Sequence, residues 1–302
     1  MDRQSFAQRN CPACGGSTPV TEVESDPRAQ EMGFEDLRPY WSGLFKDKVF
    51  FSYNRCGVCG LLFAPTYFTA RQLENLYSEM APNMEVVPVS ALAATQRGYF
   101  DAVRSLALDG DYLEIGPDVG YVAREAAAQG KFEHFWLFEP NLSVHAQLAG
   151  VVAGRPNTLV SQMDDISIVP DGTVGLAVMI HVLDHLFDPK ATLAAVHRKL
   201  KPGGRLLSVT HNEASLLRRL MGRRWPPFCL QHPELYSPRS MTEVLRRANF
   251  TSVAVSRSKN YFPIAFMAQQ AAWRFGLDIA TLPLPTVTVG LKLGNMLTVA
   301  ER

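Results

Sequence analysis

The residues LEIGPDVG at positions 113–120 give the clearest indication of the fold class of this sequence. It completes an apolar run of strand length and leads directly into the helical stretch VAREAAAQ at residues 122–129. In a doubly wound sheet a strand-to-helix turn of this kind lies where ligands bind, and its glycines let the backbone approach the ligand closely. The sequence therefore predicts a nucleotide-binding turn with five contact residues: Glu114, Gly116, Pro117, Asp118 and Gly120.

The spacing of these glycines differs from that of a dinucleotide-binding turn. A G-x-G-x-x-G loop cradles a pyrophosphate, whereas here the acidic Asp118 stands between Gly116 and Gly120. Anionic side chains on the loop disfavour a pyrophosphate, and with it an oxidoreductase, and they favour a neutral or cationic ligand. Glu139 ends the second strand 19 residues after Gly120, where an acidic side chain can accept hydrogen bonds from both hydroxyls of a ribose.

Apolar runs of strand length alternate with helical stretches beyond this turn. The strands are HFWLFEP (134–140), GLAVMIHVL (175–183) and RLLSVTHN (205–212), and the helical stretches NLSVHAQLA (141–149) and PKATLAAVHRKL (189–200) lie between them. Such alternation predicts an α/β fold, a parallel sheet covered by helices on both faces.

The C-terminal part continues in the same way. A helix stop is predicted at Gly130, and Ser237 followed by Pro238 predicts the start of a later helix. Further strands are expected at TSVAVSRS (251–258) and NMLTVAER (295–302), a helix at PIAFMAQQAAWRFG (263–276) and a loop at TLPLPTVT (281–288).

Four of the five cysteines form two C-x-x-C pairs, CPACG (11–15) and CGVCG (56–60). Two such pairs complete the closed tetrahedral geometry of structural zinc, and the glycine after each second cysteine lets the backbone amides turn toward the sulfurs. The alternative, a pair of redox-active motifs, is disfavoured because neither pair opens a helix after a βαβ-type strand. The predicted zinc ligands are Cys11, Cys14, Cys56 and Cys59.

The surroundings of the cysteine pairs favour a zinc ribbon with a long insertion. The 41 residues between Cys14 and Cys56 exceed the usual 15–20 of this pattern. The stretch FKDKVFFSY (45–53) predicts a strand leading into the second pair. Cys229 stands alone and is expected to be a small buried apolar residue.

Length and composition bound the remaining possibilities. The 302 residues, 47% hydrophobic and 20% charged with a net charge of +1, are typical of a globular protein with a sizeable core. A general polyanion binder would carry a basic excess, and no apolar stretch is long enough to span a bilayer. We expect a cytoplasmic protein in three parts: a zinc-binding ribbon-like module at 1–65, a helical connector or lid at 66–107 and an α/β domain at 108–302.

Several motifs together resemble a known family. The run YLEIGPDVGYVAREAAAQG (112–130) resembles motif I of the class I S-adenosylmethionine-dependent methyltransferases, and Glu139 in LFEPN resembles their ribose-binding acidic residue. Residues 163–165 (MDD) resemble the adenine-contacting segment. HVLDHLFDP (181–189) followed by LKPGGRLLSV (200–209) resembles the fourth-strand motif and the turn before the fifth strand.

The resemblance implies a doubly wound, mostly parallel seven-stranded sheet, with S-adenosyl-L-methionine as cofactor and a small N-terminal zinc ribbon. Paired C-x-x-C leaders are similar to those of some bacterial small-molecule methyltransferases, including sugar C-methyltransferases, and LKLGNMLTVAER (291–302) is similar to the closing strand of that group. The further cofactor contacts that it implies are Pro140, Asp164, Asp165 and His181.

Two positions depart from the family pattern. The family usually has a glycine where this chain has Asp118, and often an aspartate where the fourth strand begins with Gly175. An inward Asp118 side chain would either contact the amino group of the cofactor or spoil the site. These departures keep open a non-catalytic scaffold that has lost cofactor use.

Candidate chemistry gathers near the carboxyl ends of the strands. An imidazole suits a base at neutral pH, and His185 and His211 are the predicted catalytic residues because they follow adjacent strands. For each histidine the alternative is a hydrogen-bonded structural residue. Three further residues are assigned to substrate contact: Asp184, His232 and Tyr236, the last two expected to close the pocket from above.

A basic cluster follows the fifth strand. It contains Arg223 and Arg224, with Trp225 next to them. One reading is a solvated helix face; the other is a clamp for an anionic acceptor, with Trp225 stacked on a base. The acceptor expected here is a small molecule, a nucleotide-linked sugar or a carrier-linked intermediate. RNA or protein methylation remains an alternative, although the near-neutral charge disfavours RNA.

Overall fold

The computed structural model describes residues 5–17, 19–41, 49–78, 87–106, 108–129, 131–163, 165–274, 277, 285 and 287–302. The predicted helix stop at Gly130, the cofactor contact Asp164 and most of the predicted loop at 281–288 lie outside these residues. None of the described helices is both long and apolar enough to cross a membrane.

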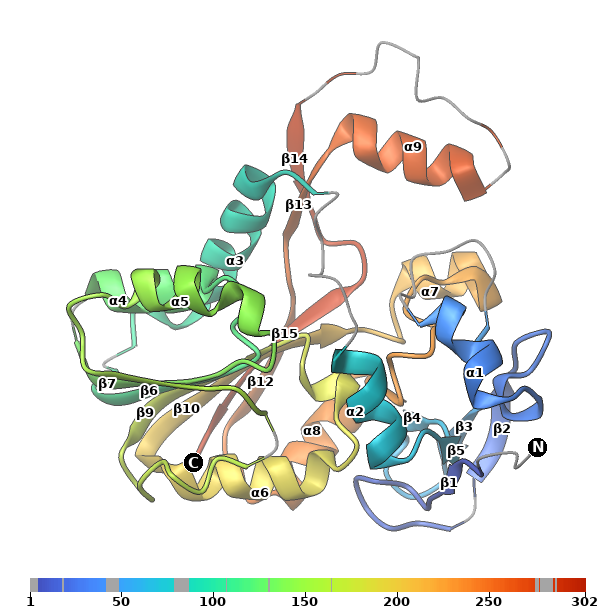
Figure 1. Ribbon diagram of the computed structural model, residues 1–302, viewed down its shortest axis with the longest axis horizontal. Helices are drawn as coiled ribbons and strands as arrows, with labels where there is room; N and C mark the ends of the chain where they lie inside the picture. Colours follow the sequence, from blue (N-terminus) through green and yellow to red (C-terminus); the bar gives the residue numbers. More distant parts are fainter. Residues whose placement is uncertain are drawn as a thin grey trace.

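A seven-stranded sheet forms the centre of the larger part of the molecule (Figure 1). The strand order is β12-β15-β10-β9-β6-β7-β8, and every neighbouring pair is parallel except the two that β15 makes with β10 and β12. This confirms the predicted doubly wound, mostly parallel sheet. The strands are β6 (Gly110–Ile115), β7 (Phe132–Phe138), β8 (Asn157–Val160), β9 (Val174–Ile180), β10 (Leu200–His211), β12 (Val253–Arg257) and β15 (Asn295–Glu301).

The strand order places a ligand-binding edge between β6 and β9. The chain runs from β6 outward to β7 and β8, then returns to the other side of β6 to form β9. Ligands of open α/β sheets bind at the carboxyl ends of the strands where the order reverses in this way. In this chain that edge carries the turns that follow β6 and β9.

Helices cover both faces of the sheet, as the alternation predicts. On one face lie α3 (Val89–Arg104), α4 (Tyr121–Gln129) and α5 (His145–Val151), and on the other lie α6 (Pro189–Lys199) and α8 (Pro238–Arg247) (Figure 1). Helix α8 begins as predicted, because the Ser237 side chain accepts a hydrogen bond from the Ser240 amide. Its buried face carries Met241, Val244 and Leu245, and burial of each contributes about 1.5–3 kcal/mol.

Gly175 is explained by packing at the opposite edge of the sheet. A Cβ atom at this position would lie 1.8 Å from the carbonyl oxygen of Asp109, so no other residue fits. Gly175 is at the amino end of β9, about 17 Å along the strand from its carboxyl end at ~3.3 Å per residue. Its departure from the family pattern therefore does not touch the ligand-binding edge.

The N-terminal part builds a second, four-stranded antiparallel sheet. Its order is β11-β4-β3-β2, and β11 comes from the far half of the chain. An aromatic cluster lies beside it, in which Phe51, Phe68 and Trp41 pack edge to face. The elements of this part are β1 (Ala7–Gln8), β2 (Pro19–Val23), α1 (Phe34–Leu37), β3 (Tyr53–Cys56), β4 (Leu62–Phe63), β5 (Thr66–Tyr67), α2 (Ala70–Ser78) and β11 (Glu234–Leu235).

The strand predicted at residues 45–53 is confirmed at Tyr53 and is wrong over residues 49–52. Residues 49–52 form no strand, and β3 begins only at Tyr53. The reason is that Phe50 exchanges backbone hydrogen bonds with the Ser25 side chain, while Phe50 and Phe51 fill two different apolar clusters.

One strand pair and the helix next to it project from the body of the molecule (Figure 1). β13 (Asn260–Pro263) and β14 (Thr288–Leu291) form an antiparallel pair, from which α9 (Ile264–Arg274) extends at the top of Figure 1. The predicted helix at 263–276 is thus confirmed from Ile264 to Arg274, whereas Pro263 ends β13. Helix α7 (Leu216–Met221) follows β10.

Candidate functional site

The glycine turn after β6 has the backbone conformation that its sequence predicts. Gly116 and Gly120 have φ values of +68° and +78°, in the left-handed region that favours glycine. A Cβ atom at Gly116 would lie 2.7 Å from Val182, so this turn packs directly against the turn that follows β9. Asp118 also has a positive φ, 51°, which explains why a glycine suits this position.

The turn is tied to the end of β7 through Glu139. One carboxylate oxygen of Glu139 accepts the Asp118 amide and the other accepts the Asn141 amide, both at 2.8 Å. Burial raises the pKa of Asp118 to about 6, and repulsion from Glu139 adds to the effect. Glu139 is itself 6% exposed. Asp118 is half-buried, so the predicted acidic pair lies together where this turn reaches the surface, next to Pro140.

Glu114 lies below this surface in the core. Its carboxylate accepts a hydrogen bond of 2.6 Å from the Tyr112 hydroxyl. Burial raises the pKa of Glu114 to about 8, although the Tyr112 hydroxyl lowers it. Pro117 is buried within the turn.

The segment predicted to contact adenine is only partly placed at the site. A Cβ atom at Gly116 would lie 3.7 Å from the sulfur of Met163, so Met163 faces the glycine turn. Asp165 is exposed, and its carboxylate accepts the Ser167 amide. Asp165 thus stabilises its own turn rather than facing Gly116.

Four histidines meet at the carboxyl ends of β9 and β10. The ring centroids of His181 and His211 lie 4.7 Å apart, those of His211 and His232 also 4.7 Å, and those of His185 and His232 4.5 Å. Two of the four, His185 and His211, are the predicted catalytic residues. The sequence order separates His232 from the others by more than 20 residues, and only the fold brings it here.

Asp184 is paired with His211. A carboxylate oxygen of Asp184 lies 2.7 Å from His211 Nδ1 and also accepts the His211 amide at 3.2 Å. Since a carboxylate can only accept, Nδ1 carries the proton and Nε2 presents a lone pair. None of the described residues hydrogen-bonds this Nε2, and the side chain is 22% exposed. The geometry is that of an oriented base.

His185 is engaged through both ring nitrogens. Nε2 lies 3.1 Å from His232 Nε2, and Nδ1 lies 3.5 Å from the Tyr77 hydroxyl. His232 Nδ1 in turn lies 2.7 Å from the carbonyl oxygen of Pro227, to which it can only donate. Sequence reasoning missed Tyr77, because nothing in its helical surroundings marks it as a site residue.

The four imidazoles ionise differently. Burial lowers the pKa of His181 and of His185 to about 3 and also lowers that of His211, although Asp184 opposes it there. Burial also lowers the pKa of His232, but Cys229 and Asp184 more than offset this and raise it to about 9. At neutral pH the cluster therefore holds one cationic ring, His232, beside the neutral His211.

His181 is held at the meeting point of the two turns. It follows β9 directly with φ of 53°, and its amide donates to the carbonyl oxygen of Val209. Its Nε2 lies 3.2 Å from the side-chain amide of Asn295, a partner that sequence reasoning also missed. Asn295 opens the last strand, β15, which lies beside β10 only in the folded chain.

Two aromatic residues are not where the sequence places them. Tyr236 is fully buried, and its hydroxyl donates to the Leu183 carbonyl oxygen at 3.5 Å, so it packs beneath the histidine cluster and does not close a pocket from above. Trp225 is 1% exposed and packs on Phe228. It is therefore unavailable to stack on a base.

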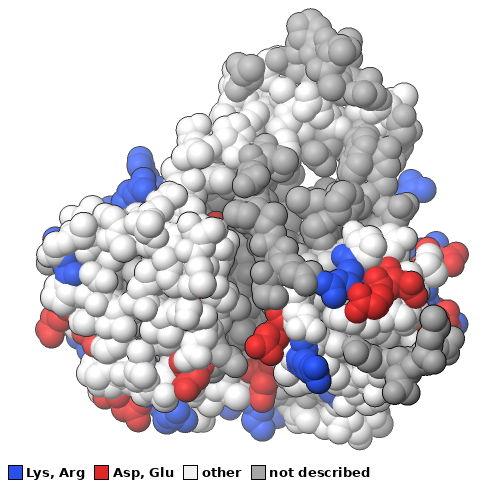
Figure 2. Space-filling model, viewed as in Figure 1, with Lys and Arg blue, Asp and Glu red and all other residues white. Residues whose placement is uncertain are grey.

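The basic cluster after β10 lies on the surface. Arg223 and Arg224 are exposed in a short helical turn that directly precedes Trp225. Arg218 is instead bound to Glu22 of the N-terminal part, at 2.8 Å. On the face shown in Figure 2, acidic and basic side chains are interspersed over the described residues, with no broad field of one sign.

The four predicted zinc ligands converge. All four sulfurs lie within 4.8 Å of one another, and Cys11–Cys59 and Cys14–Cys56 are each 3.5 Å apart. Zn–S bonds of ~2.3 Å place tetrahedral sulfurs about 3.8 Å apart, so the cluster fits this metal. Gly15 and Gly60 have positive φ, and their amides donate to the backbone carbonyl oxygen of the first cysteine of each pair.

The fifth cysteine, Cys229, is buried and has its sulfur 3.2 Å from His232 Nδ1. It lies apart from the four clustered sulfurs, in the segment between Trp225 and β11.

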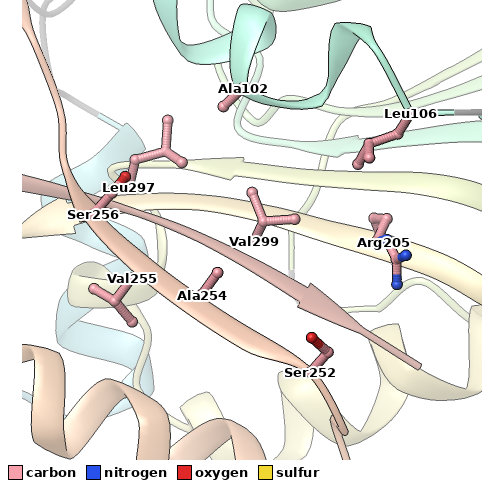
Figure 3. Close-up of a pocket in the computed structure, with 9 residues that line it drawn as sticks. All are labelled: Ala102, Leu106, Arg205, Ser252, Ala254, Val255, Ser256, Leu297 and Val299. Carbon is pink, nitrogen blue, oxygen red and sulfur yellow. The ribbon is translucent and has the colours of Figure 1, made fainter.

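A cavity of about 380 Å³ lies elsewhere on the sheet (Figure 3). It is bounded by Ala102 of α3, Ala254 of β12 and Val299 of β15. None of the predicted site residues lines it. The functional site is therefore assigned from the convergence of side chains at the strand ends.

Comparisons with known proteins agree with the fold. The family model described as methyltransferase domain matches residues 92–255, just over half of the chain. No curated protein matches the sequence.

Solved structures share the fold at low identity. One is the complex between the Haloferax volcanii Trm112 methyltransferase activator and a methyltransferase (15% identity, 70% of this chain, 93% of that chain, TM-score 0.50). Others are S-adenosylmethionine-dependent methyltransferases from Archaeoglobus fulgidus (12%, 70% and 94%, 0.49) and Mesorhizobium loti (15%, 70% and 100%, 0.46). At these identities the likeness concerns the fold alone.

Proposed function

Since the chain belongs to the methyltransferase-domain family, we propose that this S-adenosylmethionine-dependent enzyme methylates a small-molecule acceptor whose reacting atom must first lose a proton. The observation that carries the proposal is the Asp184–His211 pair, which presents an oriented imidazole base beside the turns that follow β6 and β9. When bound, S-adenosylmethionine supplies the methyl group.

The residues after β6 and β7 fit this cofactor. We assign the ribose hydroxyls to Glu139, whose oxygens keep lone pairs beyond the two that accept backbone amides. Gly116 lets this turn pack against Val182, where a Cβ atom would clash, and so fixes the position of the turn beside Glu139. Asp118 and Glu139 give this surface negative charge, which suits a sulfonium cation and its ammonium group.

His211 is assigned as the base. Its Nδ1 proton is held by Asp184, which orients the ring and stabilises the imidazolium formed when Nε2 takes a proton from the acceptor. His232, cationic at neutral pH, would stabilise negative charge that develops on the acceptor. His185 lies between His232 and Tyr77 and orients the ring of His232. His181 is assigned to packing against the cofactor.

The acceptor is proposed to carry an anionic group. Arg223 and Arg224 are exposed next to the segment that holds His232, and none of the described residues forms an ion pair with either. Guanidinium groups bind phosphate bidentately. A nucleotide-linked sugar and a carrier-linked intermediate both bear such a phosphate.

The cysteine cluster is proposed to bind a structural zinc ion. Four thiolates fill a tetrahedral shell and leave no position for a substrate. We therefore assign residues 1–65 to a zinc-binding module, residues 66–107 to a helical connector and residues 108–302 to the methyltransferase domain. The short strand β11 from this last part completes the sheet of the module.

Methyl transfer to a labelled metabolite extract tests the proposal. With methyl-labelled S-adenosylmethionine, an acceptor gains label, and His211→Gln lowers the rate by about 10²–10⁴-fold because general-base catalysis is lost. His197→Gln, on α6, is the matched control and keeps the rate. Equal labelling by the His211→Gln and wild-type enzymes would remove the base assignment.

Salt dependence tests the anionic acceptor once labelling has revealed it. Arg223→Ala/Arg224→Ala is expected to raise KM at low salt and to flatten its dependence on salt, because exposed charges are screened, with kcat unchanged. A KM that responds to salt equally in both proteins contradicts the clamp.

A further inference from the structure

Arg9 joins three segments that lie far apart in the sequence. Its guanidinium group donates to the carbonyl oxygens of Ala64 at 2.8 Å and Pro233 at 3.0 Å, and it contacts Glu234 Oε1 at 2.6 Å. A longer bond of 3.4 Å reaches the carbonyl oxygen of Phe187, two residues after His185. The Arg9 side chain is only 10% exposed and that of Glu234 is fully buried.

The segment that carries His232 is held by the N-terminal module and by Tyr67, two residues beyond the end of the module at residue 65. The Tyr53 hydroxyl donates to the His232 carbonyl oxygen at 2.5 Å, and the Tyr67 hydroxyl donates to that of Leu230 at 2.8 Å. Two residues after His232, β11 begins and pairs with β4. Tyr236, which follows β11, forms a bridge with Asn212, which follows β10 of the central sheet.

We infer that Arg9 is a positioning residue for His232, and that the N-terminal module is thereby a working part of the acceptor site. By fixing Pro233 and Glu234, Arg9 sets the height of His232 above β9 and β10. His232 Nδ1 then meets the Pro227 carbonyl oxygen, and Nε2 meets His185. The role of His232 in the acceptor site rests on the proposed function, whereas the positioning of His232 by Arg9 does not.

The buried ion pair between Arg9 and Glu234 suits the fixing of a geometry more than the gain of stability. Taking two charges out of water has a large desolvation cost, and replacing both by apolar groups is often neutral for stability. A carboxylate as deeply buried as Glu234 is therefore better explained by the geometry that it imposes than by the stability that it adds. Removing Arg9 alone would leave Glu234 buried without its partner, so paired replacement is the cleaner change.

Exchange of imidazole protons measures the positioning directly. His232 Nδ1–H, bonded to Pro227, and His211 Nδ1–H, bonded to Asp184, are both expected as protected signals in proton NMR. In Arg9→Met/Glu234→Leu we expect exchange of the His232 proton to accelerate at least tenfold and that of the His211 proton to stay within twofold. A general loss of stability would accelerate the exchange of both protons. Faster exchange of the His232 proton alone therefore shows that Arg9 positions His232 and does not merely stabilise the fold.

Two further variants complete the test. Arg28→Met, an exposed arginine of the same module, is the matched control and leaves both signals unchanged. Arg9→Gln/Glu234→Gln removes both charges and the Arg9 bond to Pro233 while keeping polar side chains, and it replaces the first double variant if the latter does not fold. Unchanged exchange at His232 in the folded variant overturns the inference. Failure of the wild-type protein to bind S-adenosylmethionine would overturn the proposed function and leave this readout intact.

Discussion

At the scale of single residues, the site depends on contrasting environments for chemically identical rings. His211 is paired with a carboxylate and keeps a neutral Nε2, while His232 is charged beside Cys229. A base and an acid whose pKa values are pushed apart can act together at one pH. From the sequence, His185 and His211 are equally good candidates for the base. The structure favours His211, because only His211 is hydrogen-bonded to Asp184.

Titration of the histidine ring nitrogens by NMR tests this contrast. We expect His232 to stay protonated up to about pH 9, and His185 to stay neutral down to about pH 3. The pair of neutral His211 and cationic His232 then exists from below the usual histidine pKa of 6.5 up to about 9. In Cys229→Ala the pKa of His232 falls, because the neighbouring thiol no longer raises it. A wild-type His232 that titrates below pH 7 contradicts the assignment.

At the scale of elements, the contact between the turns after β6 and β9 joins the cofactor side to the acceptor side. Gly116 and Gly154 share a left-handed backbone, but only at Gly116 would a Cβ atom meet a neighbour, Val182 at 2.7 Å. Both alanine variants lose about 1–2 kcal/mol from backbone strain. We expect Gly116→Ala to lower the free energy of unfolding by a further 1–3 kcal/mol or so from overpacking, measured in urea. Equal losses in the two variants would show that the turns are not in tight contact.

The sequence predicts those elements whose signal is local. The strand-turn-helix at 113–129 and the knuckles at 11–15 and 56–60 each carry their periodicity, glycines and ligands within a short stretch, and the structure has these elements. The joining of β11 to β4, the pair Arg9–Glu234 and the placing of His232 depend on residues more than 150 positions apart. No local pattern encodes such pairings, since they result from packing of the whole chain.

At the scale of the whole molecule, ion pairs join the N-terminal module to the methyltransferase domain. Besides Arg9–Glu234, Arg55 binds Glu213 just after β10, at 2.9 Å. The two C-x-x-C pairs pack in one apolar cluster with Leu183 and Leu245 of the methyltransferase domain. The module therefore braces the acceptor side of the site.

Removal of the metal tests whether zinc stabilises the N-terminal module and β11 but not the centre of the seven-stranded sheet. With a chelator, or in Cys56→Ser, we expect backbone amides of β3, β4 and β11 to exchange at least tenfold faster, because loss of zinc loosens the knuckles. Amides of β6 and β9 should keep their protection. Cys229→Ala is the matched cysteine control and retains one zinc per chain by elemental analysis. A purified protein that contains no zinc, or unchanged exchange at β3 and β4 without it, contradicts the zinc assignment.

The surface formed by the glycine turn and Glu139 is proposed to bind S-adenosylmethionine. Isothermal titration of the wild-type protein with S-adenosylmethionine or S-adenosylhomocysteine measures this binding. We expect one site per chain, with the affinity unchanged in Glu133→Ala on the exposed side of β7. In Glu139→Ala we expect an affinity weakened by tenfold or more, because hydrogen bonds to a charged group contribute about 1.5–3 kcal/mol. Absence of binding at high micromolar ligand, or equal affinity in Glu139→Ala, would show that this surface is not the cofactor site.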